Sequence, residues 1–385
     1  MIGYGNIIGA VRSRLTFLPL IYGYSNARVR AMRTSLLSRR QAEDLLKLHS
    51  SAAMAEYLTR LHFREDFSGL SPKMNDEERV ETAVGRNFAR TAQKLLRITP
   101  EQSKPTLRAF LGRYDVHNIK TILLGRKLGK QKQETEFLLI PAGSITPAEL
   151  SRMLSAKSSE ELYESIRTTE FGSRFISSKS ASHLPRQKIK EALASPHANG
   201  EMIDSLLLAL DSYYFEVAAS AVKPNEKDAD IILNLLRAEA DVKNALTIMR
   251  LKRGKADKRV IMKNLVSGGN FTKHQLEKMA EAKEVSEIPK LAPGFFVSEA
   301  GKAAFAEAEK RYKEDGQLSH FEVAFEGSLA RRSLHALHRS MMSIGTIVGF
   351  LFLKEEEMNN IRKVLRGRAL GLPMEKIAEM LVLAG

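Results

Sequence analysis

A nine-residue pattern that occurs three times constrains the fold of this chain more than any other feature. Each copy begins with an acid and has asparagine three positions later. We call this pattern the signature and its first residue the lead acid. The copies are Asp115–Leu123, Asp241–Met249 and Glu357–Leu365, with their asparagines at Asn118, Asn244 and Asn360.

Four apolar positions recur in register in every signature. Their spacing of three, three and one residues places them on one face of an α-helix. The signature therefore predicts three related helices, each with one buried face. The members are Val116, Val242 and Met358; Ile119, Ala245 and Ile361; Ile122, Ile248 and Val364; and Leu123, Met249 and Leu365.

A second pattern marks the start of a helix in three places. Ser38, Thr146 and Thr272 are each followed three residues later by Gln or Glu, which forms a capping box. Both side chains of such a box bond backbone N–H groups that the first turn leaves without partners. Apolar residues after the boxes align as well, at Ala42, Leu150 and Leu276; Leu45, Met153 and Met279; and Met54, Leu162 and Ile288.

The two patterns divide the chain into three units, each opening with a capped helix and closing with a signature helix. We expect a basic N-terminal extension at 1–21 and units at 22–139, 140–267 and 268–385. Residues 372–381 resemble the opening helix at 147–154, and we expect them to return and dock on an existing unit. Strand patterns are scarce, so the predicted fold class is all-α. Long helices are predicted at 76–96, 201–222 and 320–353, and loops at 68–74, 178–188, 223–228 and 289–294.

The composition excludes some chemistry and points to acidic or anionic partners. The 385 residues include no cysteine, which excludes disulfides and thiolate sites and favours a reducing compartment. Lysine and arginine number 60 against 45 acids, and residues 1–40 hold seven arginines and no acid. An organelle transit peptide has a similar composition, but residues 27–37 are expected to belong to the folded unit.

The longest apolar run, Met341–Leu353, is too short to span a membrane. Its 13 residues would extend about 20 Å as a helix, against a hydrocarbon core of about 30 Å. Gly345 and Gly349 lie four residues apart in this run. In a soluble protein, such a pair predicts a close crossing of two helices in the core.

The motifs of common catalytic sites are missing. We find no phosphate loop, no dinucleotide fingerprint and no defensible set of nucleophile, base and orienting group. His335 and His338 have helical spacing but no completing acid, so a surface or packing role is favoured. We interpret Glu355–Glu357 as solvated charge, and the lead acids and asparagines as helix-start and packing residues. No catalytic residue, cofactor or metal is expected.

Basic residues gather where each signature helix ends, beside glycines at Gly125–Gly129, Arg250–Gly254 and Arg366–Gly371. Cations there oppose the helix dipole, and glycine accepts the left-handed cap. This explains most of the clustering, although an anion or lipid site is compatible with it. We predict partner or lipid contacts, together with the arginines of the first 33 residues, at Arg28, Arg30, Arg126, Lys127, Lys252, Arg253, Arg366 and Arg368.

Three segments, residues 24–32, 115–129 and 348–368, resemble the C subunit of archaeal and bacterial A/V-type ATP synthases, whose eukaryotic relative is the d subunit of the vacuolar ATPase. The similarity runs from about residue 22 to the end, and the third segment is the most specific. The chain departs from the family in its extra N-terminal residues, in Ala245 and Leu246 of the second signature, and in insertions around 178–197.

The resemblance implies a funnel of three similar helical domains around a pseudo-threefold axis. It also implies a peripheral position at the cytoplasmic face of the cell membrane, on the membrane rotor ring, where the funnel receives the central stalk of D and F subunits. Such a protein transmits torque, has no catalytic residues and takes no nucleic acid. Two alternatives remain: a basic helical scaffold, and a nucleic-acid-binding protein, although no recognisable binding module is present.

Overall fold

The computed structural model describes residues 21–178, 200–224, 228–295, 298–340 and 342–382, and these residues contain no β-strand. The predicted all-α class is confirmed. The predicted loop and insertion after residue 178 lie outside the described residues, as do residues 1–20 of the predicted extension. The centre is built from long helices: α6 (Asp76–Ile98), α7 (Lys104–Lys127), α14 (Gly200–Ala221), α15 (Ala229–Arg253), α19 (Ser319–Arg339) and α20 (Ile344–Ala369).

Shorter helices surround this centre. Residues 289–294, predicted as a loop, instead form two 3₁₀ turns, because Pro289 and Pro293 each supply the backbone angle of a first helical position. The short helices are α2 (Gly23–Arg33), α3 (Arg39–Lys47), α4 (Ser51–Arg60), α5 (Arg64–Phe67), α8 (Lys132–Glu136), α9 (Pro147–Ser155), α10 (Ser159–Arg167), α11 (Glu170–Ile176), α16 (Lys258–Lys263), α17 (Lys273–Glu281), α18 (Glu299–Asp315) and α21 (Met374–Glu379).

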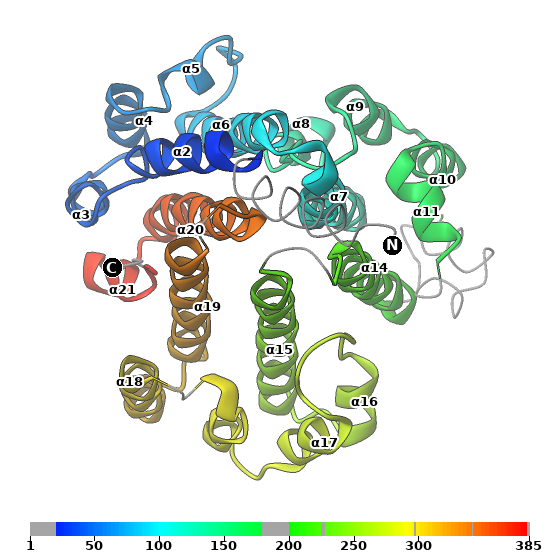
Figure 1. Ribbon diagram of the computed structural model, residues 1–385, viewed down its shortest axis with the longest axis vertical. Helices are drawn as coiled ribbons and strands as arrows, with labels where there is room; N and C mark the ends of the chain where they lie inside the picture. Colours follow the sequence, from blue (N-terminus) through cyan, green and yellow to red (C-terminus); the bar gives the residue numbers. More distant parts are fainter. Residues whose placement is uncertain (1–20, 179–199, 225–227, 296–297, 341, 383–385) are drawn as a thin grey trace, which may run out of the picture.

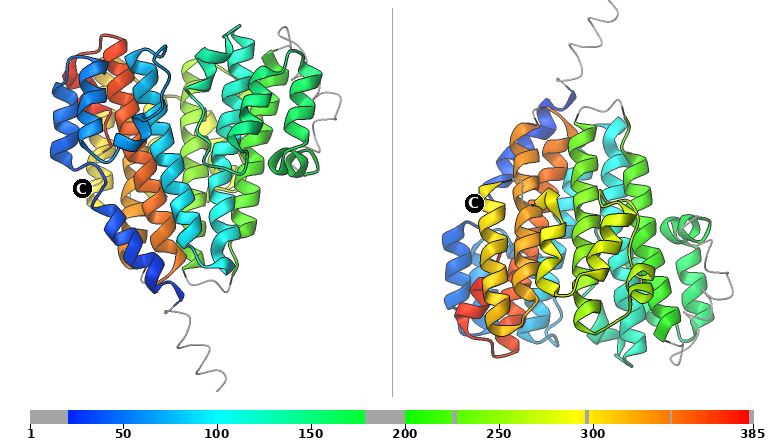
Figure 2. Two further views of the ribbon diagram at one scale, coloured as in Figure 1. Left: turned by 90° about the horizontal axis from the view of Figure 1, so that it is seen from above. Right: turned by 90° about the horizontal axis from the view of Figure 1, so that it is seen from below.

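The long helices form a closed ring. Around the ring the order is α6, α7, α14, α15, α19 and α20, and α20 packs on α6 to complete it. Figure 1 looks down this bundle, and Figure 2 shows the same helices from the side, running next to one another. The signatures lie in α7, α15 and α20, which are three alternate members of the ring.

The predicted helix starts are confirmed. Ser38, Thr146 and Thr272 each accept a hydrogen bond from the third helical N–H, and the Gln or Glu at that position bonds back to the cap. The aligned apolar residues behind the caps are buried, apart from the half-buried Leu276. All apolar positions of the three signatures are also buried.

The prediction of one long helix at 320–353 is wrong in one respect, because the helix is interrupted between α19 and α20. Ser340 leaves the helical conformation, Met342 has φ +54°, and the Ser343 side chain caps the new helix by accepting a bond from the Gly345 N–H. The apolar run therefore opens the third signature helix. Within the described residues, no helix is both long and apolar enough to cross a bilayer.

The predicted close crossing is confirmed at Gly349. A Cβ atom there would lie 2.8 Å from the Ser333 carbonyl and 2.9 Å from the Leu337 nitrogen, both in the backbone of α19. Gly345 has a different role, because its missing side chain makes room for Ser340 just before the helix. Gly349 therefore allows the close helix crossing, and Gly345 allows the interruption between α19 and α20.

The C-terminal helix docks on an existing unit as predicted, but its counterpart was assigned wrongly. The residue before α21, Pro373, follows its lead acid by 16 positions, as do Gln131 before α8 and Asp257 before α16. Helix α21 therefore corresponds to α8 and α16, and not to the opening helix α9. It packs on α3, just as α8 packs on α9 and α16 on α17.

Each signature helix ends in a left-handed residue. Gly129 and Gly371 take this conformation, as predicted, with φ values of +66° and +67°. In the second copy the prediction is wrong, because Lys255 has φ +59° while Gly254 remains right-handed. The same bond closes all three ends, from the following N–H to the carbonyl five residues earlier.

Candidate functional site: the axis and the two ends of the helix ring

The lead acids of the first two signatures hold the start of the following capped helix. Asp115 accepts a hydrogen bond of 2.8 Å from the Ile145 N–H, and Asp241 one of 3.0 Å from the Phe271 N–H. Both donors directly precede a capping residue. Burial raises the pKa of Asp115 to about 6 and also raises the pKa of Asp241. These acids are bound to backbone, as expected for packing residues. The interpretation as helix-start residues is wrong, because Asp115 and Asp241 lie in the interior of α7 and α15.

The signature asparagines bind the chain 22 residues later. Asn118 donates to the Ile140 carbonyl and accepts from its N–H, both at 2.8 Å. Asn244 makes the same pair with Val266, at 2.9 and 2.8 Å. Acid and asparagine together fix the segment between a signature helix and the capped helix that follows it.

Three charged residues meet where the signature helices approach one another, each two positions before its lead acid. We call Arg113, Glu239 and Glu355 the axial triad. The Arg113 guanidinium donates to the Glu239 carboxylate at 2.9 Å and to the Glu355 carboxylate at 2.8 Å. It also donates to the Tyr214 hydroxyl at 2.6 Å. One arginine therefore ties all three signature helices together.

An apolar layer lies three residues before the axial triad on the same helices. Its members are Phe110, Leu236 and Phe352, all buried. The rings of Phe110 and Phe352 meet edge to face at 6.2 Å, and the Arg113 guanidinium lies 4.6 Å from the Phe352 ring. Because α7 and α20 meet at matching positions on two successive levels, they run in the same direction, and α15 joins them at the axis through Glu239.

The face that carries these layers becomes exposed toward the C-terminal ends of the signature helices. The apolar layer is buried, the axial triad is 12 to 21% exposed, and the residues nine positions after the lead acids are exposed. Fourteen residues span about four turns, so these positions share a face. The axis is therefore closed near the N-terminal ends and meets solvent at the other end. The exposed residues are Leu124, Arg250 and Arg366.

The interpretation of Glu355–Glu357 as solvated charge is wrong. The three carboxylates lie in the middle of α20, where neighbouring helices pack around them. Glu355 belongs to the axial triad, and Glu357 is 6% exposed. Burial, together with the nearby Glu326 carboxylate, raises the pKa of Glu356 to about 8. Sequence reasoning missed the triad, although opposite charges at one register position were a usable indication of it.

Three of the predicted contact residues bind the ends of neighbouring helices. Each lies eleven positions after its lead acid and donates to a carbonyl at the C-terminal end of a capped helix, where the helix dipole is negative. Arg126 reaches the Ala156 carbonyl at 2.6 Å and Lys252 the Ala280 carbonyl at 2.8 Å. Arg368 donates to the Leu46 carbonyl.

The other predicted residues at this end are exposed. Arg366 donates to the buried Glu81 carboxylate at 2.8 Å. Lys127 and Arg253, each twelve positions after a lead acid, make no ion pair or hydrogen bond with the described residues. They remain candidates for a contact with a partner.

The remaining predicted residues, Arg28 and Arg30, lie on α2, toward the opposite end of the ring. The start of α2 is fixed there by Asn26, whose amide donates to the Ser343 carbonyl at 3.2 Å and accepts from the Met342 N–H at 3.0 Å. Because α7 has 24 residues, the two ends of the ring are about 36 Å apart. The predicted set is therefore divided between two ends, and Arg12 and Arg14 lie outside the described residues.

Arg28 and Arg30 are exposed and make no ion pair or hydrogen bond within the described part of the chain. Arg33, one turn further along, lies 2.6 Å from the His338 ring. His335 and His338 are both exposed, and no group of residues that could hold a metal ion occurs among those described.

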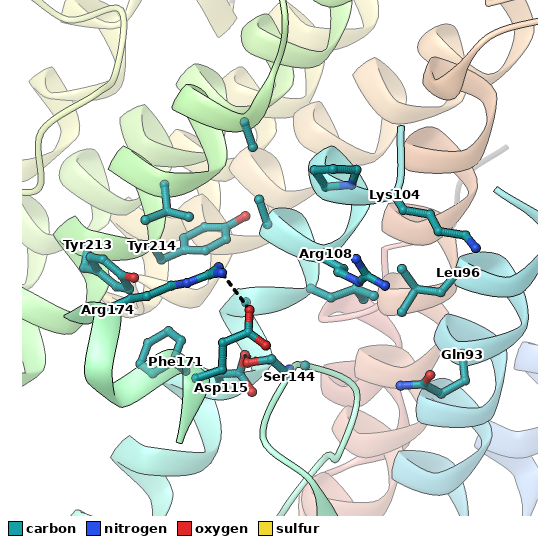
Figure 3. Close-up of a pocket in the computed structure, with 18 of the residues that line it drawn as sticks. Gln93, Leu96, Lys104, Arg108, Asp115, Ser144, Phe171, Arg174, Tyr213 and Tyr214 are labelled. Carbon is teal, nitrogen blue, oxygen red and sulfur yellow. Dashed lines mark hydrogen bonds and ion pairs between the residues drawn. The ribbon is translucent and has the colours of Figure 1, made fainter. Parts of the chain in front are cut away.

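A cavity of about 850 Å³ lies between α6, α7, α11 and α14. Arg97 and Arg108 line one wall beside Lys104, near the N-terminal end of α7. Across the cavity, Arg174 pairs with Glu170 at 2.8 Å. Figure 3 shows Arg108 and Arg174 on opposite sides of the space. Arg97 and Arg108 make no ion pair with described residues, so this wall can receive an anion.

The fold and site define an all-α protein whose long helices close around an axis and whose buried charges hold those helices together. Residues 25–380 match the family model described as ATP synthase (C/AC39) subunit. The chain belongs to this family of ATP synthase subunits.

Curated relatives match over nearly their whole length, and three of them are named as the C subunit of an A-type ATP synthase. The protein of Thermoplasma acidophilum is 24% identical over 367 residues, covering 93% of this chain and 97% of the relative. That of Methanosphaera stadtmanae is 26% identical, covering 98% and 92%. That of Methanosarcina mazei is 27% identical, covering 94% and 93%. The resemblance noted from the sequence is thus confirmed.

Proposed function

We propose that this chain is the adaptor of a rotary A-type ATP synthase that couples the membrane rotor ring to the central stalk of D and F subunits. It would have no catalytic site of its own and would lie at the cytoplasmic face of the membrane as a peripheral protein. The family match and the names of the relatives support membership of such a complex.

The observation that carries the coupling role is the shared axis of the signature helices. The axial triad connects α7, α15 and α20 directly, and the rings of Phe110 and Phe352 connect α7 with α20 one turn earlier. A twist applied to one helix is therefore resisted by the other two. Packed interiors have low compressibility and transmit strain, which suits a part that passes on torque.

The two ends of the ring support an orientation. At the C-terminal end, the inner faces meet solvent, so a stalk segment can approach the axis there. At the N-terminal end, the axis is closed and Arg28, Arg30, Arg97 and Arg108 have no partner among the described residues. A cation near anionic headgroups contributes on the order of 1 kcal/mol of attraction. We therefore assign this end to the rotor ring and the adjoining lipid.

Charge reversal at each end tests the orientation. We expect Arg28→Glu with Arg30→Glu to reduce recovery of ring subunits and binding to anionic vesicles, while D and F are still recovered. We expect Lys127→Glu with Arg253→Glu to have the opposite effect. The measurement is affinity purification from solubilised membranes with quantification of each subunit.

The matched control reverses two exposed cations on outer helices, Arg152→Glu with Lys310→Glu, which changes the net charge equally. This variant is expected to recover every partner. Wild-type recovery of both ring and stalk by both end variants would contradict the orientation. Recovery of nucleic acid alone by the wild-type chain would contradict the proposed function itself.

A further inference from the structure

The third lead acid makes the same contact as the other two, but with a distant part of the chain. Glu357 accepts a hydrogen bond of 2.7 Å from the Leu37 N–H, and Leu37 directly precedes the capping residue Ser38. The equivalent bonds of Asp115 and Asp241 join residues 30 positions apart, whereas this bond joins residues 320 apart. The third signature helix therefore holds the first capped helix.

The rest of the joint repeats in the same way. Asn360 binds both backbone groups of Val382, at 2.7 and 2.9 Å, again 22 residues later. Arg368 donates to the end of α3, as Arg126 does to the end of α9. Figure 1 shows α21 beside α3 at the edge of the ring, although they lie near opposite ends of the chain.

The three joints differ in how the chain connects them. Residues 129–146 link α7 to α9, and residues 255–272 link α15 to α17, so those joints are covalently continuous. The contact of α20 and α21 with α3, which we call the seam, has no such link. It joins the first unit to the third only through side chains and hydrogen bonds, outside the packing of α20 on α6 that completes the ring.

The seam also has charges that the other joints lack. Lys354 is buried and pairs with Glu357, and the His62 ring lies 3.6 Å from the same carboxylate. The positions equivalent to Lys354 are Gly112 and Ala238, which carry no charge. Burial acts to raise the pKa of Glu357, but Lys354 and His62 outweigh it, so that the pKa is lowered.

We propose that the seam is where the outer layer of helices opens, and that the contacts of His62 with Glu357 and Lys354 of α20 keep it closed. Opening would separate α3 from α20 and α21 while the two continuous joints stay intact. Resting on the proposed function, such opening uncovers the C-terminal half of α20 for a stalk segment, at the end of the ring where the axis meets solvent. The ion cluster replaces the restraint that a covalent link supplies at the other joints.

Hydrogen exchange tests the proposal within one molecule, because three equivalent amides report on the three joints. We expect the Leu37 N–H to exchange at least about tenfold faster than those of Ile145 and Phe271, since local opening exposes only the seam. Lys354→Met should accelerate Leu37 further and leave the other two unchanged. Equal protection of all three amides in the wild-type chain would overturn the proposal.

Spin labels provide a second readout that does not depend on the folding of the Lys354→Met variant. The chain has no cysteine, so labelled pairs need no background substitutions. Arg39→Cys with Glu375→Cys spans the seam, and Lys273→Cys with Arg259→Cys occupies the matching exposed positions at a continuous joint. We expect a second, longer distance for the seam pair only. A single, unchanged distance for both pairs would refute seam opening.

Both measurements use the isolated chain and need neither ring nor stalk. Failure of the assembly experiments would therefore leave the seam result standing, and a closed seam would leave the coupling role intact.

Discussion

Three equivalent positions on the signature helices carry Arg113, Glu239 and Glu355. Identical charges at these positions would repel one another at the axis. One arginine between two glutamates forms two charge-assisted bonds from one guanidinium, whose forked donors suit that geometry. The repeat has therefore diverged at the axis while its outer apolar face was kept.

Removing Arg113 should destabilise the fold, because Glu239 and Glu355 would stay largely buried without a neighbouring cation. We expect Arg113→Met to lower the free energy of unfolding by about 3 kcal/mol, because it leaves two largely buried carboxylates without their cation. Adding Glu239→Gln and Glu355→Gln should restore much of that loss. Chemical denaturation of the single and triple variants measures both effects. A triple variant no more stable than the single one would contradict this account of the triad.

Glu356 predicts a dependence of stability on pH. Its pKa rises from 4.5 in the unfolded chain to about 8 in the fold, so the folded state keeps a proton that the unfolded state loses in this window. The contribution to stability is present below pH 4.5 and is lost as the pH rises toward 8. Glutamine resembles the protonated carboxyl at every pH.

We therefore expect Glu356→Gln to unfold like the wild-type chain near pH 4.5 and to be more stable by about 4–5 kcal/mol at pH 8.5. Thermal or urea unfolding at the two pH values measures the difference. Glu375→Gln, at an exposed position of α21, is the control and should show no such change. A pH-independent difference between the Glu356→Gln variant and the wild-type chain would contradict the assigned protonation.

At the scale of the elements, the predicted helix starts and buried faces were correct because they depend on local patterns. A capping box needs residues three positions apart, and an amphipathic face needs only regular spacing. The break between α19 and α20 was missed because apolar residues continue through it. Ser343 caps the new helix through a local bond, and its bond to Asp228 is a tertiary contact that the sequence does not show.

The crossing of α19 and α20 gives a prediction at this scale. Gly349→Ala would place a Cβ atom 2.8 Å from a backbone carbonyl of α19, and backbone cannot move aside cheaply. We expect a loss of about 1–3 kcal/mol in the free energy of unfolding. Gly112→Ala in α7 is the control, because its Cβ would meet nothing within 4 Å. Alanine should stabilise that helix by about 0.5–1 kcal/mol, and destabilisation equal to that of Gly349→Ala would contradict the packing argument.

At the scale of the whole molecule, the repeat predicted three units, and the unit boundaries at 139/140 and 267/268 remain predictions. The structure adds the way in which the repeats connect. Each signature helix holds the capped helix that follows it around the ring, and the last one holds the first. The basic ends, which had two compatible interpretations, are divided between helix capping by Arg126, Lys252 and Arg368 and exposed cations such as Lys127.

The sequence by itself determined the elements: the all-α class, the capped starts, the buried faces of the signatures, the family and the absence of familiar catalytic motifs. These follow from spacing along one helix and from short motifs, which need no knowledge of distant contacts. Only the tertiary structure decided that Arg113 meets Glu239 and Glu355, and that Glu357 meets Leu37. Such pairs join residues more than one hundred positions apart, and their energies depend on burial that no local pattern encodes.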